Sequence, residues 1–283
     1  MNPIIGLDLG GTKVALATLC ERELSEFVVE PTDLAGSEAL IEQLVRMVEA
    51  ARPELLDGVG VGVSSVVEFD EGRVLSSTNV PLAELVARDL VILTVGTGVG
   101  GGLILGGRIY RGATEGAGEL GHTIVGLDIG SRVPPPVDFP QPGSLECAAA
   151  GQALDRAVGE VAEAAPQSVL GRVHAEGQPI LGADAVQAAH DGDAAAARMV
   201  EIWGERVGIG VANAINTFDP EEVVIGGGAA RAGELLLEPA RRVARDYVLR
   251  GLGKRTTIRL ARHGVRAGVL GAALLAVHEL AGA

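Results

Sequence analysis

Two apolar stretches of this chain run directly into glycine clusters, and this pattern constrains the fold more than any other feature of the sequence. Residues 4–9 (IIGLDL) lead into GGTK and a second apolar stretch at 14–19, and residues 90–95 (LVILTV) lead into GTGVGGG and then LIL. An apolar stretch that returns after a glycine turn is typical of a β-hairpin. Each of the two hairpins therefore has, at its turn, backbone that no side chain covers.

The order of the remaining elements predicts an α/β protein with two lobes. We expect strands at 4–9, 14–19, 58–63, 90–95, 103–109, 223–225 and 257–261, a hairpin at 66–75, and helices at 37–51, 145–158, 183–190, 194–216, 235–249 and from 268 onward. Strands are followed by helices twice along the chain, which fits two lobes with a central cleft between them. The expected lobes are residues 1–89, joined by the C-terminal helix 265–283, and residues 90–264.

Charge and cysteine usage exclude several classes of protein. The net charge of −14 argues against a nucleic-acid partner, because binding to phosphate backbones needs a basic surface. The densest basic group has helical spacing and reads as a solvated helix face: Arg241, Arg242, Arg245 and Arg250. Two distant cysteines, Cys20 and Cys147, form neither a disulfide framework nor a zinc cluster.

No targeting or membrane segment is expected. The first residues, MNPIIGLDLGG, have no basic region of the kind that opens a signal peptide. The most apolar stretch, 267–277, is shorter than the ~20 residues that a membrane helix needs. A cytoplasmic protein without membrane contact is therefore the default expectation.

The glycine turns are candidate phosphate sites. Gly96, Gly98 and Gly101 formally match a dinucleotide fingerprint, but a strand follows them where that fingerprint requires a helix. A glycine hairpin can still direct backbone N–H groups at an anion, and Thr97 adds a hydroxyl. Residues 8–13 repeat this arrangement beside a carboxylate. Either turn alone is more often only a turn, whereas the two together favour nucleotide binding.

Five stretches carry a resemblance to a known family. DLGGTK, TVGTGVGGG, GRIYRGATEGAGELGH, GSLE and INTFDPEEVVIGGG, in this order, are similar to the ROK family of bacterial sugar kinases and sugar-responsive repressors. The resemblance implies the two-lobed actin/hexokinase-like (ribonuclease H-like) fold. It also implies ATP-dependent phosphorylation of a hexose, most often glucose, and a homodimer.

The resemblance assigns roles residue by residue. ATP would be bound by Gly10, Gly11, Thr12, Lys13, Thr97, Gly98, Gly226, Gly227 and Gly228, and Asp8 would hold Mg²⁺. The sugar would be bound by Thr78, Asn79, Glu119, His122 and Glu146, whose polar groups match sugar hydroxyls as donors and acceptors. Two alternatives remain open: His122 as an ordinary buried histidine, and Glu146 as a first-turn carboxylate favoured by the helix dipole.

The sequence departs from the family in two places. Many members bind structural zinc through cysteines after the histidine, but Ser144 replaces one of these and Cys147 is alone, so we expect no zinc.

The family also has a strand, an Asn-Asp pair and a helix before the TVGTG strand, and its Asp is the catalytic base. Only LAELVARDL fills that space here, which is too short for a strand and a helix. Asp89 aligns at the wrong end of the strand to replace the base, so the catalytic residue is unknown.

Three functions follow from these observations. The first is a ROK-type sugar kinase that uses ATP and Mg²⁺, impaired if the chain has truly lost the Asn-Asp segment. The second is a non-catalytic sugar or nucleotide sensor on the same scaffold. A DNA-binding repressor ranks last, because the sequence opens on the first strand and its charge is acidic.

Overall fold

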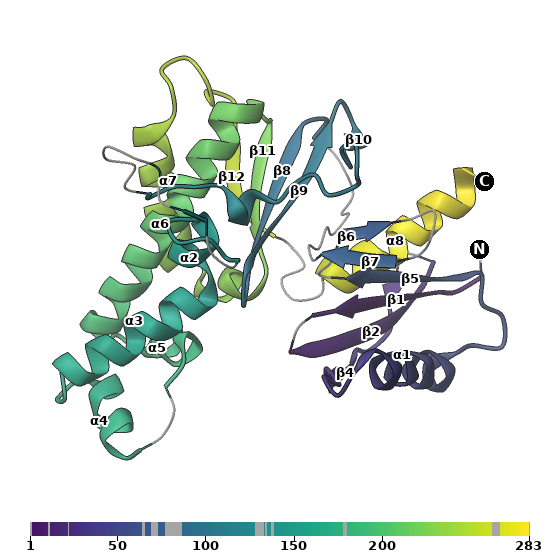
Figure 1. Cartoon of the computed structure of the whole chain (residues 1–283), viewed down its shortest axis with the longest axis horizontal. Helices are drawn as coiled ribbons and strands as arrows, with labels where there is room; N and C mark the ends of the chain where they lie inside the picture. The colour runs from purple at the N-terminus through teal and green to yellow at the C-terminus, as the bar shows by residue number, and fades with distance from the viewer. Residues whose placement is uncertain are drawn as a thin grey trace. The chain divides into compact units, whose positions relative to one another are not determined.

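The computed structural model describes residues 2–10, 12–21, 23–63, 66–68, 73–76, 87–127, 133, 135–136, 139–177, 180–261 and 267–282. The chain divides into two compact units (Figure 1). Unit 1 takes its described residues from 1–86, 111–117 and 265–283, and unit 2 takes them from 87–110 and 118–264.

Unit 1 is built on a sheet with the strand order β3-β2-β1-β5, in which β4 also pairs with β2. Its elements are β1 (Ile4–Leu9), β2 (Lys13–Cys20), β3 (Glu23–Leu24), β4 (Val28–Pro31), α1 (Ser37–Ala51), β5 (Gly58–Val63), β6 (Val66–Glu68), β7 (Arg73–Ser76) and α8 (Ala267–Gly282). Strand β1 is antiparallel to β2 and parallel to β5. Strands β6 and β7 form a separate hairpin.

Alternation along β1 sends its side chains to two helices on opposite faces of the sheet (Figure 1). Ile5 and Leu7 pack with Met47 of α1, and Ile4 packs with Ala273 of α8. The backbone of α8 lies so close to the sheet that a Cβ on Gly60 would overlap the Ala272 carbonyl oxygen. The glycines of GVGVGV therefore allow the C-terminal helix to pack onto this sheet.

Unit 2 is built on a sheet with the strand order β10-β9-β8-β11-β12. Its elements are β8 (Leu90–Val95), β9 (Val99–Leu105), β10 (Arg108–Ile109), η1 (Leu120–His122), α2 (Leu145–Ala149), α3 (Gly151–Ala164), α4 (Val169–Ala175), α5 (Gly182–His190), α6 (Ala194–Phe218), β11 (Glu222–Gly226), η2 (Gly228–Ala232), α7 (Glu234–Tyr247) and β12 (Thr257–Leu260). Strand β8 is antiparallel to β9, and β11 is parallel to both β8 and β12.

Helix α6 organises unit 2. It packs against β8, β11, α2 and α7, and Gly204 and Gly208 let the α7 backbone approach it closely. The buried Trp203 indole N–H donates to the Ala149 carbonyl oxygen at 2.7 Å. Because this bond fixes the end of α2, α6 helps to position the short helix that carries Glu146.

The structure corrects two expected elements. The second strand of the LVILTV hairpin begins at Val99 rather than at residue 103, because three of the glycines lie within the strand and not in the turn. The helix expected at 145–158 is interrupted at Ala150, whose backbone is extended (ψ 161°). The interruption lets the Gly151 N–H donate to the Gly96 carbonyl oxygen at 2.7 Å.

The two sheets share the pairing of three strands. Each has an antiparallel hairpin, β1–β2 or β8–β9, and a parallel strand beside the first strand, β5 or β11. In unit 2 a further parallel strand, β12, pairs with β11. Among the described residues, β5 pairs with β1 alone.

No helix in the described part of the chain is long and apolar enough to cross a membrane.

Candidate functional site

The segment that carries Glu119 and His122 lies directly on strand β9. A Cβ on Gly101 would overlap the Gly118 carbonyl oxygen, and a Cβ on Gly121 would overlap that of Val99. This close approach explains why β9 is rich in glycine. It brings the two candidate sugar ligands together, with 3.6 Å between His122 Nε2 and Glu119 Oε2.

The His122 ring is held from the other side by the proline-rich segment. The Phe139 ring meets it edge to face, with 5.3 Å between the ring centroids and 80° between the planes. His122 Nδ1 is buried and has no hydrogen-bond partner among the described residues. The side chain as a whole is 32% exposed, and its other nitrogen, Nε2, is the one that faces Glu119.

Glu146 lies in the first turn of α2 and reaches the glycine turn. Ser144 caps this helix, because its hydroxyl accepts from the Cys147 N–H. The Glu146 carboxylate accepts from the Val99 N–H at 2.7 Å. A Cβ on Gly98 would come within 2.5 Å of Glu146 Oε2, so the glycine leaves the space that this carboxylate occupies.

Backbone hydrogen bonds close the turn at 96–98 and connect it to the start of α3. The Gly96 N–H donates to the Gly98 carbonyl oxygen at 2.9 Å, and the Gly96 carbonyl oxygen accepts from Gly151. Thr97 is exposed at the tip. Contacts with α2 and α3 thus fix the position of this turn. Backbone N–H groups and a hydroxyl at such a turn suit an anion.

The glycines after β11 lie beside this turn. Gly226 pairs with Thr94 in the parallel ladder. Gly227 has a φ of 77°, and a Cβ there would come within 2.5 Å of the Val95 carbonyl oxygen. Residues 96–98 and 226–228 therefore lie together where β8 and β11 end, the edge at which α/β sheets bind their ligands.

The N-terminal hairpin carries the remaining candidates in unit 1. The Gly10 N–H donates to the Lys13 carbonyl oxygen at 2.9 Å, which closes the turn, and Thr12 and Lys13 are exposed. Burial raises the pKa of Asp8 above its ordinary value, and the charge of Lys13 opposes this shift. The Asp8 carboxylate packs against Gly268 at the start of α8.

Asp8 fits a role in binding Mg²⁺, which prefers oxygen ligands and often takes only one or two carboxylates. A desolvated carboxylate gains from a cation that replaces its lost hydration. Cys147 Sγ donates to the Pro140 carbonyl oxygen at 3.5 Å. Within the described residues there is no group of three or more His, Cys, Asp or Glu side chains suited to a metal ion.

Three of the candidates lie outside the described residues: Gly11, Thr78 and Asn79. Sequence reasoning missed two contacts. Phe139 gave no signal beyond being one of 4 phenylalanines. The bond from Val99 to Glu146 joins residues 47 positions apart, and no local pattern encodes such a contact.

Comparison with known proteins gives the setting of this site. The two sheets belong to the actin/hexokinase-like fold: a ROK family glucokinase from Streptomyces griseus, solved with glucose and AMPPNP, superposes with a TM-score of 0.80 at 26% identity, over 98% of this chain and all of that one. The ROK family model matches residues 82–279. The chain belongs to the ROK family.

Its relatives include both enzymes and regulators. A glucokinase from Halalkalibacterium halodurans is 27% identical over 94% of this chain and 92% of its own length. A xylose repressor from Caldicellulosiruptor bescii is also 27% identical, over 99% of this chain and 79% of the repressor. At the level of the family, a sugar-kinase role is supported.

The alignment with the H. halodurans glucokinase also shows that this chain is shorter within the matched region. It spans 309 positions but contains only 94% of 283 residues, about 266, so about 43 positions face no residue of this chain.

Proposed function

We propose that this chain binds Mg-ATP and a hexose, with glucose as the first candidate, and that it phosphorylates the hexose slowly. The observation that carries the proposal is the contact of Glu146 with the turn at 96–98. One short helix thereby places a candidate sugar ligand against a candidate phosphate loop. The glucokinase relatives support glucose as the substrate to test first.

The sugar would be bound by Glu119, His122 and Glu146. Carboxylates accept from sugar hydroxyls, and a neutral imidazole nitrogen either donates or accepts. The contact at 3.6 Å between His122 Nε2 and Glu119 Oε2 is too long for a strong hydrogen bond. A sugar hydroxyl between the two groups would donate to the Glu119 carboxylate and accept from an Nε2–H of His122. Thr78 and Asn79 remain proposed sugar ligands from the family resemblance.

The phosphates would be bound by the two glycine turns. The turn at 96–98 offers backbone N–H groups and the Thr97 hydroxyl, and residues 226–228 lie beside it for the adenosine. In unit 1 the segment of Gly10, Gly11, Thr12 and Lys13 would bind the phosphates, and Asp8 would hold Mg²⁺ there. Bound Mg²⁺ would neutralise phosphate charge, and the residues of the chain would orient the nucleotide.

Glu146 would have a second role as a positioning residue. The same carboxylate that contacts the sugar also fixes the Val99 N–H, so loss of Glu146 should disturb the nucleotide as well as the hexose. A residue that only contacted the sugar would, when lost, weaken hexose binding alone.

Calorimetric titration of glucose, and thermal unfolding with Mg-ATP, test the binding proposal. Glu119→Ala should abolish or sharply weaken glucose binding, because each unpaired polar group costs about 1–3 kcal/mol. Mg-ATP should raise the melting temperature by mass action, and Thr12→Val should reduce that rise. If the wild-type chain binds neither ligand, the glycine turns are only turns.

A non-catalytic sensor is the second candidate, and one feature of the sequence favours it. Only LAELVARDL stands before and at the start of β8, which is too short for a strand and a helix. By the family resemblance, a strand with the Asn-Asp pair belongs in the segment before β8. Tight binding of both ligands with no turnover would favour the sensor over the kinase.

A further inference from the structure

The segment from Arg241 to Arg259 is basic in an acidic protein. It has seven Lys or Arg residues and one acid, Asp246, whereas the whole chain has a net charge of −14. The segment covers the second half of α7, the following loop and most of β12. Nothing in the proposed hexose and nucleotide sites uses these cations.

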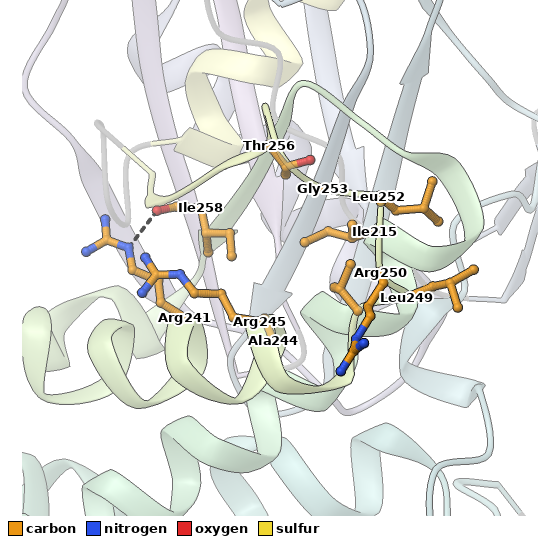
Figure 2. A pocket seen from close by; sticks show the side chains of 12 residues that line it. Ile215, Arg241, Ala244, Arg245, Leu249, Arg250, Leu252, Gly253, Thr256 and Ile258 are labelled. Atoms are coloured by element: carbon orange, nitrogen blue, oxygen red, sulfur yellow. Dashed lines mark hydrogen bonds between the residues drawn. The ribbon is translucent and has the colours of Figure 1, made fainter.

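A pocket of about 260 Å³ opens within this segment (Figure 2). It lies where α6 and α7 end and β12 begins, and it is lined by Ile215, Arg241, Ala244, Arg245, Val248, Leu249, Arg250, Gly251, Leu252, Gly253, Thr256 and Ile258. Because β12 runs parallel to β11, the pocket lies at the opposite end of the sheet from Gly226 and the turn at 96–98. It is therefore a different place from the candidate active site.

Ion pairs compensate the charge of Arg241 and Arg242, and only Arg241 of these two lines the pocket. Arg241 bonds Glu238 at 2.6 Å and the Ile258 carbonyl oxygen at 2.9 Å. Arg242 bonds Glu205 at 2.7 Å. Arg245 and Arg250 are exposed and form no ion pair within 4 Å in the part of the chain that the structure describes. Arg245 does help to lower the pKa of Glu238, mainly held down by Arg241.

The rest of the lining is mostly apolar. Figure 2 shows Arg241 and Arg245 reaching from one side and Arg250 lying on the other, with Ile215 and Ile258 between them. The Thr256 hydroxyl already donates to the Pro220 carbonyl oxygen at 2.6 Å. A ligand that fits this lining would place its charged group at one arginine side of the pocket and its carbon skeleton against the aliphatic side chains.

We propose that this pocket binds a small organic phosphate monoester. A phosphate carries close to two negative charges and three acceptor oxygens, which suit guanidinium groups. Arg245 also offsets the partial negative charge at the end of α7, and Lys254 and Arg255 in the next loop add positive potential. The volume is slightly below the 300–1,000 Å³ typical of sites for larger ligands, which favours a compact molecule.

Calorimetric titration of the full chain with phenyl phosphate and with inorganic phosphate tests this proposal. Phenyl phosphate should bind more tightly than inorganic phosphate, because its ring covers the apolar lining. The double variant Arg245→Ala/Arg250→Ala should weaken phenyl phosphate at least ~10-fold, as expected for lost charge-assisted hydrogen bonds. Both side chains are exposed, so the fold should tolerate the change.

Arg242→Ala is the matched control, because Arg242 lies on the same helix but does not line the pocket. It should leave phenyl phosphate affinity unchanged. An equal loss in Arg242→Ala would reduce the effect to general charge and overturn the site. Absence of binding to the wild-type chain, or equal affinity for the two probes, would overturn the proposed ligand. None of these three outcomes bears on the hexose or nucleotide proposals.

Discussion

At position 98 glycine leaves the space that the Glu146 carboxylate occupies, whereas at position 96 no atom lies within 4 Å of a Cβ. Gly98→Ala should therefore displace Glu146 from the Val99 N–H, and Gly96→Ala should not. We expect Gly98→Ala to weaken Mg-ATP roughly tenfold, in line with the loss of one hydrogen bond to a charged group. Calorimetric titration of Mg-ATP into both variants measures the difference.

Glu146→Gln completes this comparison, since its amide oxygen still accepts from Val99 but its charge is lost. It should keep more Mg-ATP affinity than Glu146→Ala. If both Glu146 variants lose only glucose affinity and bind Mg-ATP normally, Glu146 is a sugar ligand without a positioning role, and the binding proposal itself is unaffected.

Asp8 gives a second prediction at the residue scale. Its pKa is raised in the folded protein by burial, with Lys13 acting in the opposite direction. A carboxyl with a raised folded pKa favours the fold at low pH, and this contribution is lost as pH rises from the ordinary value through the folded one. The ionised group thus destabilises the fold at neutral pH, and Asp8→Asn should raise the melting temperature there.

Thermal unfolding of wild type and Asp8→Asn from about pH 4 to about pH 8 checks this sign. The advantage of Asp8→Asn should grow with pH, starting from the ordinary Asp value of about 3.9. The same variant should lose most of the stabilisation by Mg-ATP. A melting temperature that falls at neutral pH would show that the carboxylate stabilises the fold instead.

At the scale of elements, the sequence pattern predicts most of the fold because its signals are local. The apolar stretch at 4–9 and the helix expected at 37–51 correspond to β1 and α1. The interruption of the expected helix at Ala150 has no such signal, because alanine favours helix. The interruption is accompanied by a bond between Gly151 and Gly96, which lie far apart in the chain.

The same distinction applies to the candidate site. Glycine motifs and polar residues at 97, 119, 122 and 146 are visible in the sequence. The contacts that arrange them, Val99 with Glu146 and Phe139 with His122, depend on tertiary packing. Sequence reasoning therefore finds the candidate ligands but not what holds them.

The proline-rich segment can be tested as an element through Phe139. Phe139 is 73% exposed although its ring contacts His122, so it contributes little to the core. Phe139→Ala should weaken glucose roughly 2- to 10-fold, since edge-to-face pairs contribute about 0.5–1.5 kcal/mol. Val133→Ala, at a similarly exposed position of the segment, should change nothing. Equal glucose affinity in both variants would remove Phe139 from the site.

At the scale of the whole molecule, this chain is shorter than a glucokinase relative with which it aligns over most of its length. About 43 positions of the alignment with the H. halodurans glucokinase face no residue of this chain. On the family resemblance, a strand and a helix with the catalytic Asp would precede β8, where the sequence has only LAELVARDL. We expect insertion of a strand, an Asn-Asp pair and a helix between Leu82 and Glu84 to restore activity, as measured by a coupled assay.

The turnover of the unmodified chain is the most direct measurement. General-base catalysis contributes roughly 10²–10⁴ in rate. The 283-residue chain, with its intact mass confirmed, should therefore bind glucose and Mg-ATP yet phosphorylate glucose at least ~100-fold more slowly than the H. halodurans glucokinase in the same coupled assay. Turnover equal to that relative would contradict this expectation, and it would mean that another carboxylate of this chain serves as the base.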